Sequence, residues 1–389
     1  MSVNFQNLER AFIAKSDREL HRAYQLFELM GNQTVNKILT TLTNLSFSMR
    51  LPISPLVRVT VFDQFCGGIN LQDCTKTINL LGSHGVNTCL DYSVEAKRSN
   101  DGFDDTVNEL VRMVDYACNN DHVSFVVVKP TAIASENLME KISNNESLNA
   151  KEKTDWEKVK TRLQKIADLV TEKGQRLFID AEDSWYQPCV DKFAVDLMSE
   201  YNKKSPVIFN TVQFYRWDRL EYLMNLIERA RSEGFRLGLK NVRGAYLEKE
   251  RNRAQNRGYT SPIQKDKKST DKDYDLAIRI CVNNLDVVDF CAATHNAQSL
   301  ENLLRLMEEG KLSKNHPQVS MSQLFGMGDN LSFNLASEGY NVCKYLPYGP
   351  VRDIIPYLIR RAEENSSISG QMGREQSMIL EEMRRRGLL

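Results

Sequence analysis

The sequence predicts an α/β protein whose main unit is a (βα)8 barrel. Two observations predict it: eight short apolar runs lie between residues 85 and 347, and longer amphipathic segments separate them. Apolar runs of about 4–8 residues that alternate with helices are typical of buried parallel strands. Eight such units in roughly 250–300 residues match the size of one closed barrel.

The composition is that of an ordinary globular protein. Of the 389 residues, 41% are hydrophobic and 26% are charged, with 51 Lys and Arg against 51 Asp and Glu. A net charge of zero argues against a nucleic-acid binder that relies on bulk charge, so we expect no nucleic-acid partner. No apolar run approaches the roughly 18 residues of a membrane-spanning helix. The eight cysteines form no C-x-x-C pair and no two histidines have ligand spacing, so we expect reduced buried thiols and no metal site.

Residues 1–55 are predicted to form an N-terminal helical extension, and residues 56–389 the barrel domain. Ser16 and Glu19 have the spacing of a capping box, and apolar residues at helical spacing follow them. Pro55 closes a short proline-containing segment, which cannot continue a helix.

Eight strands are predicted in the barrel domain. They are residues 85–92, 123–129, 176–182, 207–214, 236–242, 287–294, 319–325 and 341–347. The polar stretch 251–272 is predicted to be a long loop, and residues 381–386 a solvated basic helical tail.

Ionisable and amide side chains end the predicted strands. Barrel enzymes carry their chemistry at the carboxyl ends of the strands, which meet at one rim. Because a buried charge is costly unless it is paired or functional, such a ring is not expected of a purely structural core. The strand-end residues are Asp91, Glu95, Lys129, Asp180, Glu182, Gln213, Tyr215, Lys240, Thr294, His295, Asn296, Gln323 and Tyr345.

The helix after the eighth strand adds Tyr357, Arg360, Arg361 and Glu364, which fall on about one quarter of the helix circumference. Guanidinium groups bind carboxylates and phosphates through paired hydrogen bonds. The rim therefore suits a small zwitterionic or anionic substrate. On residue types alone, hydride transfer, aldol chemistry and phosphate-ester chemistry all remain open.

Several motifs resemble those of the proline dehydrogenase family, in the family's order, over about residues 60–370. They are the segments 240–246 (KNVRGAY), 293–296 (ATHN), 345–351 (YLPYGPV) and 357–365 (YLIRRAEEN), together with 179–182 (IDAE). The resemblance is to the single-function branch of the family, and it implies a distorted (βα)8 barrel that binds FAD. The implied reaction is the oxidation of L-proline to Δ1-pyrroline-5-carboxylate, the first step of proline catabolism, with a quinone as electron acceptor.

The resemblance also implies residue roles. Arg360 and Arg361 would hold the substrate carboxylate, and Glu95 would pair with Arg360 to close the site. Lys129 would line the substrate site near Asp180, and Tyr345 would pack on the proline ring. The cofactor residues would be Gln213, Lys240, Val242, Arg243, Gly244, Ala245, Tyr246, Lys267, Thr270, Thr294, His295, Asn296, Arg361 and Glu364.

Asn241 departs from the leucine that is usual in the family, and we expect its side chain to border the substrate. The alternative function is therefore hydroxyproline dehydrogenase, whose substrate hydroxyl group would welcome a polar partner. Tyr345 opposes this alternative, because that relative usually has a serine there.

Two further functions compete with an oxidoreductase. A Schiff-base aldolase would use Lys129 or Lys240 as its nucleophile. An α/β scaffold without activity would not explain the ring of strand-end charges.

A quinone acceptor implies peripheral contact with a membrane. Residues 36–50 carry an amphipathic pattern that suits either packing on the barrel or a membrane surface. We expect a cytoplasmic protein at the inner face of a bacterial membrane. A mitochondrial matrix location ranks lower, because residues 1–10 show no presequence pattern.

Overall fold

The computed structural model describes residues 3–31, 61–94, 99–367 and 371–389. For residues 29–31, 362–367 and 371–372 it describes the backbone alone. Within these ranges, no helix has both the length and the apolar character that crossing a bilayer requires.

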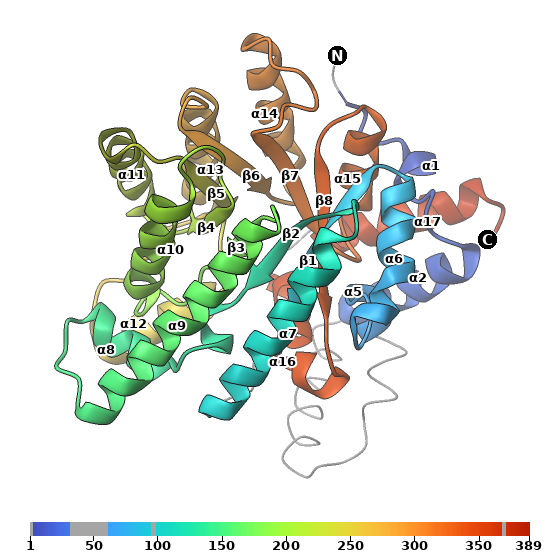
Figure 1. Ribbon diagram of the computed structural model, residues 1–389. Coiled ribbons are helices and arrows are strands. Elements are labelled where there is room, and N and C mark those ends of the chain that lie inside the picture. Colours follow the sequence, from blue (N-terminus) through green and yellow to red (C-terminus); the bar gives the residue numbers. More distant parts are fainter. Residues whose placement is uncertain (1–2, 32–60, 95–98, 368–370) are drawn as a thin grey trace.

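A closed barrel of eight parallel strands forms the centre of the molecule (Figure 1). Each strand pairs with the next in sequence, and the first pairs with the last. The predicted barrel and its eight strands are thus confirmed. The strands are β1 (Val86–Tyr92), β2 (Val123–Val128), β3 (Leu177–Ile179), β4 (Ile208–Gln213), β5 (Leu237–Val242), β6 (Val288–Ala293), β7 (Val319–Leu324) and β8 (Val342–Tyr348).

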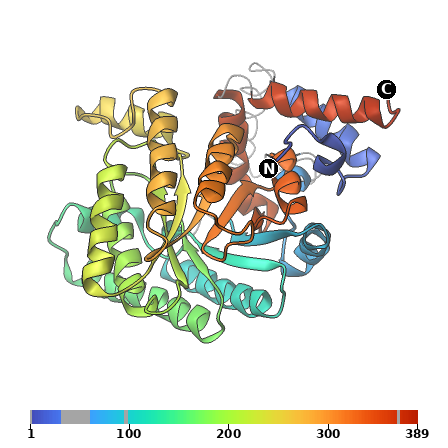
Figure 2. The ribbon, with the colours of Figure 1, turned by 90° about the horizontal axis from the view of Figure 1, so that it is seen from above.

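Helices surround the barrel and also extend it at one side (Figures 1 and 2). Those between or after strands are α7 (Asn100–Cys118), α8 (Glu136–Ser143), α9 (Ala150–Glu172), α10 (Gln187–Tyr201), α11 (Arg219–Glu233), α12 (Leu247–Arg257), α13 (Lys267–Val282), α14 (Ala297–Glu309), α15 (Asp329–Ser337), α16 (Val351–Ser367) and α17 (Gln371–Arg385). Those before the barrel are α1 (Leu8–Ala11), α2 (Asp17–Gly31), α5 (Asp63–Phe65) and α6 (Leu71–Ser83), and a 3-10 turn, η2 (Pro130–Ala132), follows β2.

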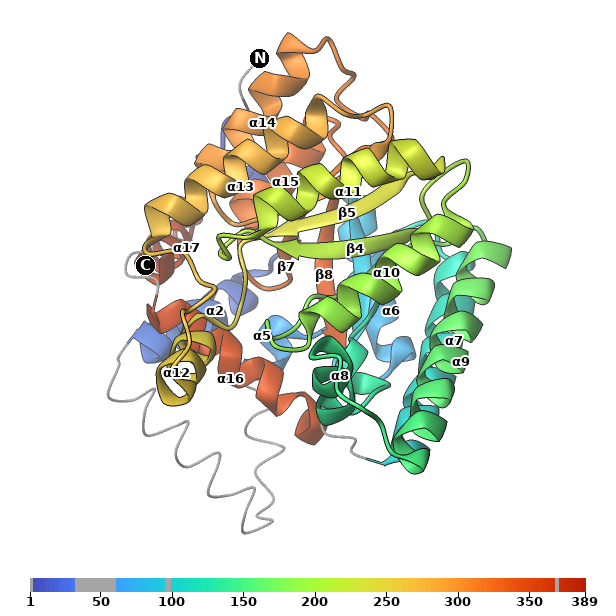
Figure 3. The same ribbon diagram turned by 90° about the vertical axis from the view of Figure 1, so that its left-hand side faces the viewer.

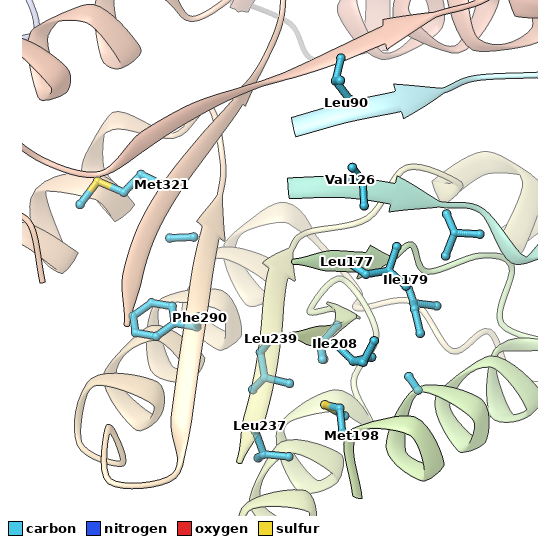
Figure 4. Packing of buried hydrophobic residues seen from close by; sticks show 14 of the residues in the cluster. Leu90, Val126, Leu177, Ile179, Met198, Ile208, Leu237, Leu239, Phe290 and Met321 are labelled. Carbon is cyan, nitrogen blue, oxygen red and sulfur yellow. The ribbon is translucent and has the colours of Figure 1, made fainter. Parts of the chain in front are cut away.

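Side chains alternate between the two faces of the barrel wall. Residues such as Leu90, Val126 and Leu239 belong to the large cluster shared by strands and helices (Figure 4). Their neighbours fill the lumen, where the rings of Phe125 and Phe178 stack with centroids 4.0 Å apart. The lumen is therefore a packed core, and open space begins only at its carboxyl end.

The N-terminal helices pack on the C-terminal ones. The predicted capping box is present, because the Ser16 amide donates to Glu19 at 2.8 Å and the Glu19 amide donates to the Ser16 hydroxyl at 3.3 Å. Side chains of α1, α2, α16 and α17 form one buried cluster that includes Phe27 and Met383. Figure 2 shows α17 beside the N-terminal helices. The predicted helix at 36–50 lies outside the described residues.

Two predictions for polar segments were wrong. The stretch 251–272 is mostly helical, because α12 runs to Arg257 and α13 begins at Lys267. A left-handed Gly258 ends α12 and the Asp266 side chain caps α13, so only a short connection remains. The tail is not simply solvated either: Glu382 is fully buried on α17 and pairs with Arg385 and Arg386.

All eight cysteines lie in described ranges and are free thiols. Seven are buried, as predicted, and Cys118 is exposed.

A buried lysine holds the connection between β7 and α15 (residues 325–328). The ammonium of Lys344, fully buried on β8, pairs with Asp329 at 2.8 Å. It also donates to the carbonyl of Met327 at 2.6 Å and to that of Leu324 at 3.3 Å. The Gln64 side chain donates to the Gly326 carbonyl at 2.6 Å. The connection is thus tied to β8 and to the segment before the barrel.

Replacing Lys344 by Met should therefore lower the free energy of unfolding by about 3–5 kcal/mol, because Asp329 would keep a buried charge without its main partner. Denaturant titration followed by circular dichroism measures the loss. Lys314→Met is the control: its pair with Glu338 is partly exposed, and its removal should cost no more than about 1 kcal/mol. Equal losses for the two variants would contradict the role given to Lys344.

Candidate active site

A cavity of about 730 Å³ opens at the carboxyl ends of the strands. Its size is that of a pocket for a large organic ligand. The predicted site residues that line it are Lys129, Asp180, Gln213, Lys240, Val242, Arg243, Gly244, Ala245, Tyr246, Lys267, Thr294, His295, Asn296, Tyr345, Arg360 and Arg361. Strands and helices far apart in sequence therefore bring most of the predicted site together.

A chain of ion pairs and hydrogen bonds crosses the floor of the cavity. The Lys129 ammonium pairs with Asp91 at 2.5 Å and donates to the Tyr345 hydroxyl at 3.1 Å. That hydroxyl donates to Asp180 at 2.8 Å, and the other oxygen of Asp180 pairs with Lys240 at 2.5 Å. Lys129 thus pairs directly with Asp91, and the Tyr345 hydroxyl links it to Asp180.

Asp180 stays ionised although it is buried. Burial alone would raise the pKa of Asp180, but the ammonium groups of Lys240 and Lys129 hold that pKa below its usual value. Burial and the Asp180 carboxylate together raise the pKa of Tyr345 well above its usual value. The floor of the cavity therefore combines the ion pairs of Lys129 and Lys240 with a phenol that keeps its proton.

Two arginines of α16, Arg360 and Arg361, line the same cavity. Arg360 lies over the Tyr246 ring, 5.9 Å from its centroid, and Arg361 lies 5.1 Å from the centroid of Tyr357. Tyr246 precedes α12, so α12 and α16 flank the same end of the barrel (Figure 3). Glu95, predicted to pair with Arg360, lies outside the described residues, as does the side chain of Glu364.

Arg243 organises the β5–β6 side of the cavity. Its guanidinium donates to Asp271 at 2.7 Å, to Thr294 at 2.6 Å and to Ser299 at 2.9 Å. It also lies 4.2 Å from the centroid of the Tyr274 ring. Such a network fixes the planar group in one orientation against the cavity.

Gly244 adopts a φ of +143°, which other residues rarely adopt. A Cβ there would come within 2.4 Å of the Tyr215 ring. The glycine is therefore required by Tyr215 as well as by any ligand that approaches the backbone.

Two helices begin beside the cavity, and their first residues line it. Lys267 starts α13 and Ala297 starts α14, whose N-cap is Asn296. Helix N-termini and lysines favour anionic groups such as phosphates. Thr270, predicted to reach the same region, is buried in α13 with its hydroxyl directed to the Asp266 carbonyl and does not line the cavity.

His295, which lines the cavity, carries a buried N–H group. Its Nε2 accepts a hydrogen bond from the Leu324 amide at 3.1 Å, which places the proton on Nδ1. Nδ1 is buried and has no partner among the described residues. Burial and the nearby Lys344 and Arg361 lower the pKa of His295 to about 3, so the ring is neutral at physiological pH.

The prediction that Asn241 borders the substrate was wrong. Its side chain is fully buried on the outer face of β5, where Nδ2 donates to Cys281 of α13 at 3.4 Å. The reason is the two-residue period of a strand, which directs Lys240 and Val242 to the cavity and the residue between them away from it. The replacement of the usual leucine by Asn241 therefore affects the packing of β5 against α13 and does not affect the cavity.

The cavity also contains side chains that the sequence analysis did not assign to the site. Arg374, Glu375 and Met378 of α17 line it, as do Met327 and Asn330 near the start of α15. The α17 residues were missed because no sequence signal folds the C-terminal helix back over the barrel mouth.

Replacing Asn241 by Leu should raise the free energy of unfolding by about 1 kcal/mol, because the Asn241 Oδ1 has no hydrogen-bond partner within the described structure. Thermal and denaturant unfolding of the purified variant measure the change. A loss of stability above about 1 kcal/mol would show that the amide makes a contact that stabilises the fold.

His295 should make stability depend on pH. Below pH 6.5 the unfolded chain protonates this ring, whereas the folded chain does so only near pH 3. The folded state therefore loses about 1.4 kcal/mol per pH unit from this group as pH falls from 6.5 towards 3. Unfolding titrations between pH 7 and 4.5 should show a shallower slope for His295→Gln, and parallel slopes would refute the assignment.

Comparisons with known proteins show which sequences and structures this chain resembles. The model of the family described as "Proline dehydrogenase" matches residues 74–374. The chain is 34% identical to "Carbapenem antibiotics biosynthesis protein CarD" of Pectobacterium carotovorum subsp. carotovorum, over 83% of each chain. It is 27% identical to "Proline dehydrogenase 1, mitochondrial" of Dictyostelium discoideum, over 97% of this chain and 74% of that one.

Among solved structures, proline utilization A (PutA) from Bdellovibrio bacteriovorus, inactivated by N-propargylglycine, has a similar fold. The TM-score is 0.72 at 19% identity, over 92% of this chain. The chain spans 38% of the length of that structure.

Proposed function

Because the chain belongs to the proline dehydrogenase family, we propose that it oxidises L-proline to Δ1-pyrroline-5-carboxylate, with FAD as the hydride acceptor. The observation that carries the proposal is that Arg360 and Arg361 line the same large cavity as Lys129, Asp180, Lys240 and Tyr345. The two arginines can hold the carboxylate of a substrate, and the phenol of Tyr345, which is fixed by hydrogen bonds, can pack on a small ring.

The residues of the cavity fit FAD. The neutral His295 offers a buried N–H without a partner, and the helix N-termini at Lys267 and Ala297 suit a pyrophosphate. Gln213 donates to the Glu182 carbonyl at 3.1 Å, which fixes the amide that we assign to the isoalloxazine edge. Once bound, FAD supplies the two-electron acceptor that no amino-acid side chain provides.

Within the proposed complex, the chain binds and orients the substrate. Arg360 and Arg361 hold the carboxylate, and Lys129 adds a third positive charge. These cations and the exclusion of water both favour the neutral amine, which must release hydride from the adjacent carbon. Glu95 remains our proposed partner of Arg360 in closing the site.

We propose proline over trans-4-hydroxyproline because of Tyr345. Hydrogen bonds to Asp180 and from Lys129 hold its hydroxyl in place, so the ring cannot easily move aside for a 4-hydroxyl group. With Asn241 directed away from the cavity, the polar partner expected for that hydroxyl is missing at this position.

The Schiff-base alternative is less well supported. A nucleophilic lysine needs a neutral amine with an available lone pair. Both candidates, Lys129 and Lys240, instead donate to carboxylates at 2.5 Å.

For the electron acceptor we propose a membrane quinone, and for the location the cytoplasmic face of a membrane. The quinone follows from the family resemblance, and the membrane contact follows from the quinone.

The decisive experiment is anaerobic mixing of the purified protein with L-proline while the visible absorption of oxidised flavin is followed. We expect the flavin to bleach, and Arg361→Met to weaken the apparent affinity for proline about 10- to 100-fold through loss of a charged hydrogen bond. Arg352→Met, exposed on the same helix, is the matched control and should behave as the wild type.

Three outcomes would sink the proposal in different ways. A colourless protein that binds no FAD would contradict the assignment of FAD as the cofactor. Bleaching by trans-4-hydroxy-L-proline but not by proline would select the alternative substrate. Equal affinities of Arg361→Met and Arg352→Met would remove the carboxylate-binding role of Arg361.

A further inference from the structure

The C-terminal helix α17 forms one wall of the cavity. Its residues Arg374, Glu375 and Met378 line the space. Met378, Ile379 and Met383 are buried in the cluster that α17 shares with the N-terminal helices. The part of α17 that lines the cavity is therefore held in position by the packing of neighbouring residues of the same helix.

Glu375 is built into this wall. It is only 7% exposed, and its Oε1 accepts a hydrogen bond from the Gly328 amide at 2.8 Å. Gly328 has a φ of +64°, and a Cβ there would come within 2.7 Å of Nδ1 of His295. An acceptor, Glu375, and a donor, His295, thus flank the same glycine.

No ion pair compensates this buried carboxyl group within the described part of the chain. Burial and the nearby Asp329 raise the pKa of Glu375 to about 7, while the Gly328 amide, Lys344 and Lys15 act in the opposite direction. A buried carboxylate with a single hydrogen bond retains acceptor capacity for a donor that enters the cavity. The hydroxyl groups of a polyol are such donors.

We propose that Glu375 is a further cofactor-binding residue, whose carboxylate accepts hydrogen bonds from hydroxyl groups of FAD on the ribityl chain or the adenosine ribose. The inference rests on the proposed function, since it takes FAD as the ligand. It assigns a role in the site to the C-terminal helix.

The groups around Glu375 predict how cofactor affinity depends on pH. His295 has its pKa lowered to about 3, and the pKa of Asp329 is lowered by Lys344 and Lys15 despite burial, so neither titrates near neutrality. The Lys344 ammonium pairs with Asp329, and Arg361 lines the same cavity as Glu375. A hydroxyl group donates more strongly to a carboxylate than to a carboxylic acid. Affinity should therefore rise as pH increases through 7.

The test is fluorescence titration of the full-length apoprotein with FAD, and separately with FMN, from pH 6 to pH 8. Wild-type Kd for FAD should fall about tenfold over this range, as a single ionisation near pH 7 requires. Glu375→Gln keeps an acceptor for Gly328 but lacks the charge, so its Kd should be about tenfold higher at pH 8 and independent of pH. Glu381→Gln, exposed on the same helix, is the control for net charge.

The two ligands locate the contact. Weakening of both FAD and FMN by Glu375→Gln assigns the ribityl hydroxyls, and weakening of FAD alone assigns the adenosine ribose. Wild-type Kd values and pH dependence in Glu375→Gln would overturn the inference and leave Glu375 as a loop clamp only. If the wild type itself bound no FAD, the proposed function would fail. That result differs from an unchanged Kd in Glu375→Gln, which would contradict only the role of Glu375.

Discussion

The site depends on mutual compensation among charges that the closed barrel crowds into one small volume. Parallel strands all end at the same rim, so Asp91, Lys129, Asp180 and Lys240 meet there whatever their distance in sequence. Removed from water, each of these ions would be unfavourable alone, and together they alternate in sign around the Tyr345 hydroxyl. Arg360 and Arg361, which we propose to bind the substrate carboxylate, come instead from α16 and line the same cavity.

The architecture and most of the cavity wall could be predicted from the sequence because both follow local rules. Apolar runs mark buried strands, and residues at strand ends share one rim. The same reasoning failed for Asn241 by one position: its neighbours Lys240 and Val242 face the cavity, and strand alternation turns the residue between them outward. Strict use of the two-residue period would have corrected that prediction from the sequence alone.

Other features lay beyond such rules because they depend on where separate segments meet. Glu382 reads as part of a charged tail, yet it is buried because α17 packs across the N-terminal helices. Glu375 and Arg374 reach the cavity for the same reason. The segment 251–272 was misread because its many charges suggested solvation, whereas Arg, Glu, Lys and Ala also favour helices. For Glu382, Glu375 and Arg374, the residue types were clear from the sequence, but the segments that they pack against were not.

The aromatic layer beneath the site limits access to it. Phe125, Phe178 and Phe209 fill the lumen directly under Lys240, and Phe178 lies 5.2 Å from its ammonium. Among the described residues, this plug blocks any passage along the barrel axis. In the proposed function, proline and the electron acceptor cannot approach the flavin through this aromatic layer. Both would have to approach it from the side of the barrel where the strands end.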